Sequence, residues 1–576
     1  MSLTSLTWSK PYILPIPQAT KFLNWNRICA LIIISTIVSG IFLRFFGYKD
    51  HVTYIDELMV ITEGRWNSFG NEYSSRSDSA VDFTKNLMNS GGVSYAPLQF
   101  IATYFFIKNS RPLSKKSLEQ ARLVSVIIGC FSVIFICLLF YEINNCKLSS
   151  SFLIPLTLFS ICQINIINSQ QAHPYMLGVF SYIFLIYSLL IIVKSKNLYL
   201  CIALSFVLCL LPFSNYLLIP VILISLTLSW LSLVSTSGQT ASFYRLSCFK
   251  ILFLIPLMFI SIILAMWVYE NKSSMSIPWW VHSFKIKDNY PSYTDLFLDL
   301  SKNIFYTLES TLTIAFNKTT NNIALFIYFA VFFIGLLNII YISLKKLVKY
   351  NSNHHEHKIL NVFYLPLFII LASLIYLIGL FILNKIAISP SRHLLMLSTI
   401  FMIIIFYCSI SFKNLIDRFF PKNSAANLLN IIFSVSILIP SLLDNISNAN
   451  RKKEAFQPEK LIEISKKTNS NIVATDYYSY DKYFIYLEPY IILNKIKLII
   501  IDTEEKNLPK EKFLLVGQFT DHYRYLYYAR NYQNYKSELI FKDHKNYDFE
   551  PSEKITYWPN NMEVYAVEPI KTNKRL

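Results

Sequence analysis

Long apolar runs dominate the first 445 residues of the chain and predict its main elements. A helix crosses about 30 Å of hydrocarbon with roughly 20 apolar residues. Eleven runs reach or approach that length: 28–46, 121–141, 150–167, 174–193, 197–213, 215–235, 250–268, 322–344, 360–383, 393–412 and 427–445. A shorter run, 95–107, predicts a re-entrant or interfacial helix. We therefore expect an α-helical polytopic membrane protein with about 11 transmembrane helices.

The basic residues predict how these helices are oriented. If residues 1–27 are cytoplasmic, Lys and Arg gather in every cytoplasmic segment. The opposite turns at 168–173 and 214–215 carry no Lys or Arg, and 384–392 carries only Lys385 and Arg392. This asymmetry follows the positive-inside rule. It predicts a cytoplasmic N-terminus, an extracytoplasmic C-terminus, and a transmembrane domain over 28–445 whose external loops are 47–120 and 269–321.

Residues 446–576 differ in character from the rest of the chain. Polar sequence alternates there with short runs rich in β-branched residues, which are typical of strands. The runs are 471–475, 497–502, 513–517 and 562–567. We expect a soluble extracytoplasmic α/β domain, which either binds an acceptor or serves only as a packing platform.

Composition narrows the class of protein. Hydrophobic residues make up 54% of the 576 residues and charged residues 15%, whereas soluble domains carry about 25% charge. A disordered chain, a collagen and a coiled coil are excluded, and a soluble multi-domain enzyme is disfavoured. The net charge of +18 lies largely in cytoplasmic loops, so it indicates no nucleic-acid partner. The lipid bilayer is the expected environment, and the high Ile, Asn and Lys content favours a bacterial inner (plasma) membrane.

Polar clusters at the extracytoplasmic face are candidates for chemistry, since charges near the membrane are costly and usually functional. Tyr54-Ile-Asp56-Glu57 follows the first span, and its carboxylates suit a general base or a divalent cation, or simply begin a solvated loop. The block 168–175 holds Gln170, Gln171, His173 and Tyr175 in a short turn. A helix cap before Pro174 explains only part of that block.

A cationic cluster opens the tenth span. Arg392 lies where a lipid phosphate would sit, and an Arg binds phosphate with two parallel hydrogen bonds. Lys385 lies seven residues earlier and could assist. The alternative for Arg392 is an interfacial side chain that reaches toward lipid headgroups.

Taken in order, these elements resemble the GT-C superfamily of integral membrane glycosyltransferases, in particular the branch of protein O-mannosyltransferases and lipid A aminoarabinose transferases. That branch has an Asp-Glu pair in the first external loop, as at Asp56 and Glu57. The other matching motifs are Tyr95-Ala-Pro-Leu98, Arg122-Leu-Val-Ser125, Ser169-Gln-Gln-Ala-His-Pro-Tyr175, Asn215-Tyr216 and Pro390-Ser-Arg-His-Leu-Leu395.

The sequence also departs from the family pattern. The family turn has Glu and Arg where this chain has Gln171 and His173, and two family His positions hold Tyr95 and Asn215. A carboxylate and a cation are therefore missing from the turn, which puts metal binding there in doubt. No cofactor is assigned, and a divalent cation held by Asp56 and Glu57 is left open.

The resemblance implies an inverting transfer of a sugar from a polyprenyl-phosphate donor to a lipid, glycan or protein acceptor at a periplasmic active site of the cell envelope. In this interpretation Asp56 is the base, Glu57 orients it or an ion, and Arg392 and Lys385 bind the donor phosphate. Tyr54, Tyr95, Gln170, Gln171, His173, Tyr175, Asn215 and Tyr216 would line the substrate pocket. The alternatives are a polysaccharide ligase or polymerase that uses lipid-linked sugar and a secondary transporter, which the 12 glycines and the absence of an apparent repeat disfavour.

Overall fold

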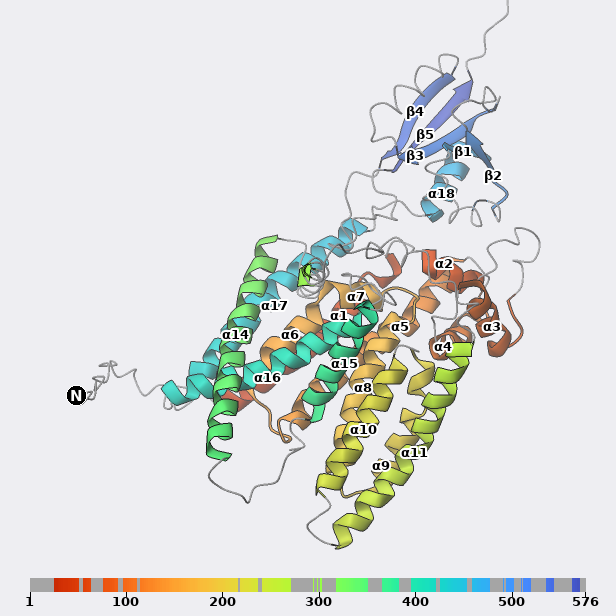
Figure 1. The fold of residues 1–576 in the computed structure, drawn as a ribbon. Coiled ribbons are helices and arrows are strands. Elements are labelled where there is room, and N and C mark those ends of the chain that lie inside the picture. The colour runs from red at the N-terminus through yellow and green to blue at the C-terminus, as the bar shows by residue number, and fades with distance from the viewer. Residues whose placement is uncertain are drawn as a thin grey trace, which may run out of the picture.

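The computed structural model forms a bundle of long helices with a small mixed α/β domain at one end (Figure 1). It describes residues 25–50, 55–63, 76–91, 97–110, 114–215, 218–236, 241–270, 294, 298, 301–302, 318–350, 365–382, 395–420, 425–452, 458–476, 491, 494–501, 509, 511–518, 535–542 and 562–569. The statements that follow concern these residues.

Each of the eleven predicted membrane segments contains a helix. Seven helices are long and apolar enough to cross a membrane: α1 (Trp25–Phe45), α5 (Lys115–Ile143), α8 (Tyr175–Lys194), α11 (Ala241–Glu270), α14 (Lys318–Tyr350), α16 (Leu395–Phe419) and α17 (Ala425–Lys452). Three apolar helices are shorter: α9 (Leu198–Leu208), α10 (Leu218–Thr236) and α15 (Leu365–Ile382). The chain is an integral multi-pass membrane protein.

One predicted span, 150–167, is broken. It is built from α6 (Leu153–Ile161) and α7 (Gln163–Ser169), whose axes are bent by 50°. The break falls at Cys162, where φ is −57° and ψ is 122°, outside the helical region. Such a break frees backbone carbonyls near the end of α6, which other groups in the bundle must satisfy.

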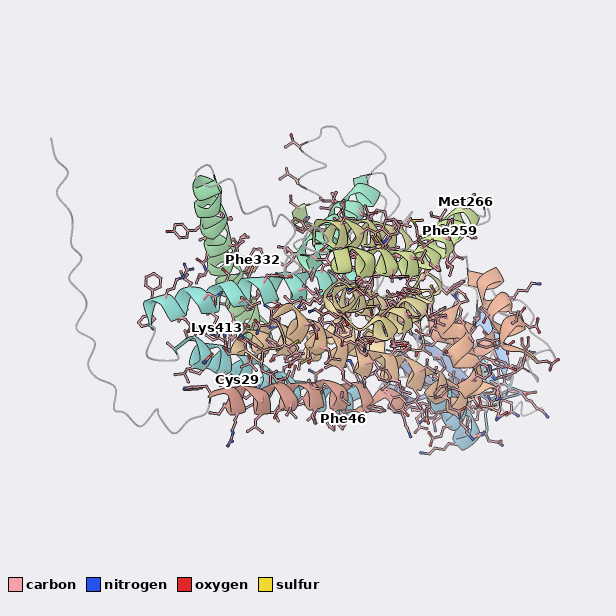
Figure 2. All side chains as sticks on the ribbon, turned by 90° about the horizontal axis from the view of Figure 1, so that it is seen from below. Cys29, Phe46, Phe259, Met266, Phe332 and Lys413 are labelled. Carbon is pink, nitrogen blue, oxygen red and sulfur yellow. The ribbon has the colours of Figure 1, made fainter. Side chains whose placement is uncertain are left out.

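The two ends of the bundle are distinct. Figure 2 labels Cys29 near the start of α1 and Phe46 just past its end, and Lys413 of α16 lies near Cys29. We call the opposite end, which carries α2 (Ile55–Thr62), α3 (Ala80–Gly91) and α4 (Leu98–Ile107), the domain end (Figure 1). There α4 matches the interfacial helix predicted over 95–107, and with 10 residues it is too short to span.

The domain end has a hydrophobic core of its own, distinct from the main core of the bundle. Side chains from α2, α3, α4 and α5 meet in it, and Phe83, Ile61 and Ile107 are fully buried. Ser79 begins α3, because its hydroxyl accepts a hydrogen bond of 3.1 Å from the backbone N–H of Asp82. The helices of the domain end lie directly below the α/β domain in Figure 1.

The small domain contains α18 (Pro458–Thr468) and a five-stranded sheet in the order β2-β1-β3-β5-β4. Strands β1 (Ile472–Asp476), β2 (Lys497–Ile501) and β3 (Phe513–Gln518) run parallel, and β4 (Tyr535–Lys542) and β5 (Met562–Pro569) complete it with antiparallel pairs. The four predicted strands are confirmed, and β4 was not predicted. Ile462 of α18 packs against both the core of this domain and the core of the domain end.

Close backbone packing holds α14 against α16, which leads to a prediction. A Cβ on Gly335 would overlap the backbone of Cys408, so Gly335→Ala is expected to lower the free energy of unfolding by about 1–3 kcal/mol. Gly379→Ala is the matched control, because a Cβ there meets nothing within 4 Å and Ala favours a helix over Gly. Thermal unfolding in detergent measures both variants, and an equal effect of the two would contradict this packing.

Candidate functional site

The candidate site is built where the loop after α1, the helix α2, the first turns of α5 and the turn between α7 and α8 meet. The short 3₁₀ turn η2 (Tyr48–Asp50) connects α1 toward α2. Residues far apart in the sequence thus come together at the domain end. Nearly every polar side chain of the turn at 168–173 is withdrawn from solvent.

A buried ion pair holds these elements together. Arg122 donates from Nε to Glu57 Oε1 at 2.8 Å and from Nη2 to Glu57 Oε2 at 2.7 Å. The two side chains are 1% and 0% exposed. Glu57 Oε1 also accepts a hydrogen bond of 2.8 Å from the backbone N–H of Ala172, and Arg122 Nη1 donates to the Tyr48 carbonyl at 3.2 Å. One carboxylate therefore joins α2, α5 and the turn.

Gln170 ties the turn to the end of α1. Its Nε2 donates to the carbonyl oxygens of Leu43 and Phe46, each at 2.8 Å. These carbonyls belong to the last turn of α1 and the residue after it, where helical partners are missing. The side-chain amide of Gln170 thus donates hydrogen bonds to both carbonyls and fixes the position of the turn relative to the end of α1. The sequence predicts that Gln170 lines the substrate pocket. In the structure its side-chain amide connects the turn to α1.

His173 and Tyr175 lie on the other side of the turn. Their rings stack with centroids 3.9 Å apart and planes inclined by 26°. The His173 carbonyl accepts hydrogen bonds from Gln99 Nε2 at 2.9 Å and from Ser125 Oγ at 3.3 Å. The turn is thereby anchored to α4 and α5 through its backbone, and the two stacked rings are buried beside it.

Gln171 and Asn215 complete the described part of the predicted pocket. Gln171 is 2% exposed, and its Oε1 has no hydrogen-bond partner among the residues that the structure describes. Asn215 lies against α8, since a Cβ on Gly178 would be 2.8 Å from Asn215 Nδ2. Gly178 is three residues after Tyr175, so the two positions share a face of α8. Asn215 therefore lies on the same side of α8 as the turn.

Several predicted site residues are not placed. Only the backbone of Asp56 is described, as the second residue of α2 and the direct neighbour of Glu57. The other predicted residues outside the described part of the chain are Tyr54, Tyr95, Tyr216, Lys385 and Arg392. Their roles stay predictions.

A second ion pair, which the sequence did not predict, fixes the end of α2. Arg76 Nη1 lies 3.7 Å from Glu63 Oε1, and its Nε donates to the Ser110 carbonyl at 3.0 Å. Burial lowers the pKa of Arg76 to about 10, and the nearby Glu63 carboxylate opposes this shift. The guanidinium stays charged at neutral pH and joins α2, α3 and the residues after α4. It supports the site without facing the turn.

Arg44, in the last turn of α1, was not predicted as a functional residue from the sequence. Its side chain is 0% exposed and donates from Nη1 to the carbonyl oxygens of Gly40 at 2.8 Å and Ser160 at 2.9 Å. The Ser160 carbonyl lies just before the break between α6 and α7. The sequence did contain a signal for Arg44. A charged Arg inside an apolar membrane segment is costly unless it is buried in protein, so it indicates a buried polar contact or a functional site.

Metal binding was left open for Asp56 and Glu57. Within the described ranges, no three His, Cys, Asp or Glu side chains gather in a way that could hold a metal ion. The oxygens of Glu57 are engaged by Arg122 and Ala172. A cation at this place would have to compete with a guanidinium for the Glu57 carboxylate.

Comparison with known proteins gives structural neighbours only. No family model matches the sequence, and no curated protein matches it. A crystal structure of the Archaeoglobus fulgidus oligosaccharyltransferase with Zn and sulfate matches at 11% identity and a TM-score of 0.41, over 81% of this chain and 62% of that chain. This chain thus spans less than two thirds of that enzyme.

Other neighbours give similar values. Archaeal AglB from the same organism, in complex with an inhibitory peptide and a dolichol-phosphate, matches at 10% identity and a TM-score of 0.42, over 91% of this chain and 73% of that one. ArnT from Cupriavidus metallidurans, bound to undecaprenyl phosphate, matches at 8% identity and 0.40, over 94% and 98%. Similarities of this size do not assign an activity to this chain.

Proposed function

We propose that this protein is a glycosyltransferase that moves a sugar from a polyprenyl-phosphate donor to a lipid, glycan or protein acceptor at the extracytoplasmic membrane face. The observation that carries the proposal is the ion pair between Glu57 and Arg122. It is bidentate, fully buried and bonded to the backbone of Ala172. It holds α2, and with it the backbone of Asp56, at a fixed place beside the turn that contains Gln171 and His173.

The proposed reaction uses Asp56 as the general base. The acceptor hydroxyl oxygen attacks the anomeric carbon while the bond from that carbon to the phosphate oxygen breaks. The hydroxyl proton passes to the Asp56 carboxylate, and the polyprenyl phosphate leaves as an anion. Arg392 and Lys385 are proposed to stabilise the charge that develops on the leaving phosphate. Inversion at the anomeric carbon follows from the single displacement.

The described turn suits a sugar. We propose that the apolar face of a pyranose packs beside the buried, stacked rings of His173 and Tyr175. Gln171 Oε1 is a buried acceptor that a sugar hydroxyl would satisfy. Glu57 acts in this scheme as a positioning residue, because Arg122 and the Ala172 N–H occupy its oxygens.

Product release tests the proposal directly. Purified protein in nanodiscs is incubated with a lipid extract that contains polyprenyl-phosphate sugars and with an isolated envelope fraction as acceptor. Mass spectrometry is expected to show free polyprenyl phosphate accumulating only when acceptor is present. Absence of free polyprenyl phosphate when donor and acceptor are both present would contradict the transfer reaction, and a transporter would leave the lipid-linked sugar intact.

The proposed orientation is testable with native cysteines. Cys146 and Cys248 are exposed, and they lie in segments that the charge pattern predicts to be cytoplasmic. A membrane-impermeant maleimide should therefore label them in permeabilised cells and not in intact cells. Partial desolvation and the Glu142 carboxylate raise the pKa of the Cys146 thiol, so its labelling should quicken as the pH of the reaction is raised. Labelling of Cys146 in intact cells would contradict the predicted orientation and indicate that this segment is extracytoplasmic.

A further inference from the structure

Arg44 presents an unoccupied hydrogen-bonding edge deep in the bundle. Its Nη1 is fixed by the carbonyl oxygens of Gly40 and Ser160. Its Nε and Nη2 are buried and have no hydrogen-bond partner among the described residues. These two nitrogens form the side of the guanidinium that binds an oxyanion with two parallel hydrogen bonds.

Arg122 shows in the same protein what this edge can bind. There Nε and Nη2 donate to the two oxygens of the Glu57 carboxylate, while Nη1 donates to a backbone carbonyl. Arg44 has the backbone bonds but no carboxylate on the matching edge within the part of the chain that the structure describes. Nη1 of each arginine thus donates to backbone carbonyls. Among the described residues, only Arg122 has a carboxylate at its Nε and Nη2 edge.

The Arg44 side chain points away from the nearer membrane surface. Its bond to Gly40, four residues earlier, directs the guanidinium back along α1 and away from the domain end. A Cβ on Gly129 would lie 3.1 Å from Arg44 Cδ, and Gly129 is about 10 Å further along α5 than Arg122. An interfacial Arg ordinarily extends toward the headgroups, so this direction is not explained by solvation.

Other polar groups converge on the same place. The hydroxyl of Ser160 is buried and has no hydrogen-bond partner among the described residues, although its own carbonyl accepts from Arg44. Ser169 lies beside Gly129 and Arg44, and Gln170 donates to the carbonyl of Leu43. The turn at 168–173 is thus adjacent to Arg44 through Ser169 and Gln170.

We infer that the Nε and Nη2 edge of Arg44 binds a phosphate oxyanion, with the Ser160 hydroxyl as an additional donor. An oxyanion from outside the chain would satisfy the two buried donors of Arg44, and the tetrahedral phosphate group matches the fork of a guanidinium. The inference rests on the proposed function for the source of that phosphate, a polyprenyl-phosphate lipid. Free inorganic phosphate has the same chemistry and is distinguished by the experiment.

Native mass spectrometry of the purified full chain with undecaprenyl phosphate tests the site. Arg44→Gln removes the charge and the fork of the guanidinium. The affinity of this variant for undecaprenyl phosphate is expected to be about 10- to 100-fold lower than that of the wild type. Arg44→Lys keeps a charge and donors for the Gly40 and Ser160 carbonyls but has no fork, so a loss of about tenfold is expected. Lys250→Gln is the control, since Lys250 is a buried cation that donates to the Val193 carbonyl at 3.2 Å, away from the turn.

Wild-type affinity in folded Arg44→Gln and Arg44→Lys would overturn the inference. If neither variant folds, cryo-electron microscopy of the wild type with undecaprenyl phosphate decides. Phosphate density at Nε and Nη2 supports the inference, and phosphate density only elsewhere overturns it while leaving the proposed function intact.

Inorganic phosphate is titrated in parallel. Binding to the wild type and not to Arg44→Gln, with no binding of undecaprenyl phosphate, would establish a site for the free anion and count against the proposed function. If the wild type binds neither probe, both the inference and the lipid-phosphate donor fail.

Discussion

Replacement of Asp56 by Asn is expected to lower sugar transfer by about 10²- to 10⁴-fold, the usual contribution of a general base. Asn has nearly the same shape as Asp and cannot accept the proton of the acceptor hydroxyl. Because Asp56 is the direct neighbour of Glu57 in α2, the ion pair that positions α2 is unchanged in this variant. Folding, membrane insertion and binding of the donor lipid should therefore be retained.

The rate of release of polyprenyl phosphate by the purified variant measures this effect. Asp78→Asn is the matched control, because Asp78 is an exposed carboxylate in the same external segment and its backbone carbonyl accepts the Tyr104 hydroxyl bond. It should retain full activity. An Asp56→Asn enzyme that works at nearly the wild-type rate would remove the base from the proposed reaction.

Breaking the ion pair between Glu57 and Arg122 is expected to cost about 3–5 kcal/mol of unfolding free energy, because the remaining partner becomes an uncompensated buried charge. Arg122→Met removes both guanidinium hydrogen bonds to the Glu57 carboxylate and keeps the bond from the backbone N–H of Ala172. Glu57→Gln removes the carboxylate charge that the Arg122 guanidinium pairs with. Each variant should unfold at a lower temperature in detergent and lose transfer activity as α2 moves relative to the turn.

The double variant Glu57→Gln with Arg122→Met separates the ion pair from simple loss of packing. Its cost should be well below the sum of the two single costs, since no charge remains buried. Lys413→Gln is the control, because the pair of Lys413 with Asp417 is partly exposed, 24% and 39%, and lies at the other end of the bundle. It should cost less than about 1 kcal/mol. Additive costs in the double variant would mean that the two residues are not coupled.

The lengths and positions of the apolar runs were sufficient to predict most of the membrane helices. Apolar runs located the helices because lipid permits few alternatives to a helix. The break at Cys162 was not predicted, because the run 150–167 is apolar as a whole and the bond from Arg44 to the Ser160 carbonyl beside the break joins residues 116 positions apart. Helix α17 also continues to Lys452, past the predicted end at 445, because a polar sequence can extend a helix into water.

The site was only partly accessible from the sequence. The Asp-Glu pair and the polar turn were identified because polar residues are costly near lipid, and the structure brings Glu57 next to Ala172 of that turn. The role of Arg122 as the partner of Glu57 could not be predicted, because 65 residues separate them. Arg44 was missed because a single charge within an apolar run hardly changes its mean hydropathy.

Mass spectrometry of surface glycans and envelope lipids in a deletion strain tests the central claim most directly. We expect one glycan, glycolipid or glycoprotein to lose a defined sugar in the deletion strain. The wild-type gene and the Asp78→Asn variant should restore that sugar, and Asp56→Asn should not. Unchanged glycans and lipids after deletion, or full restoration by Asp56→Asn, would contradict a glycosyltransferase with its base at Asp56.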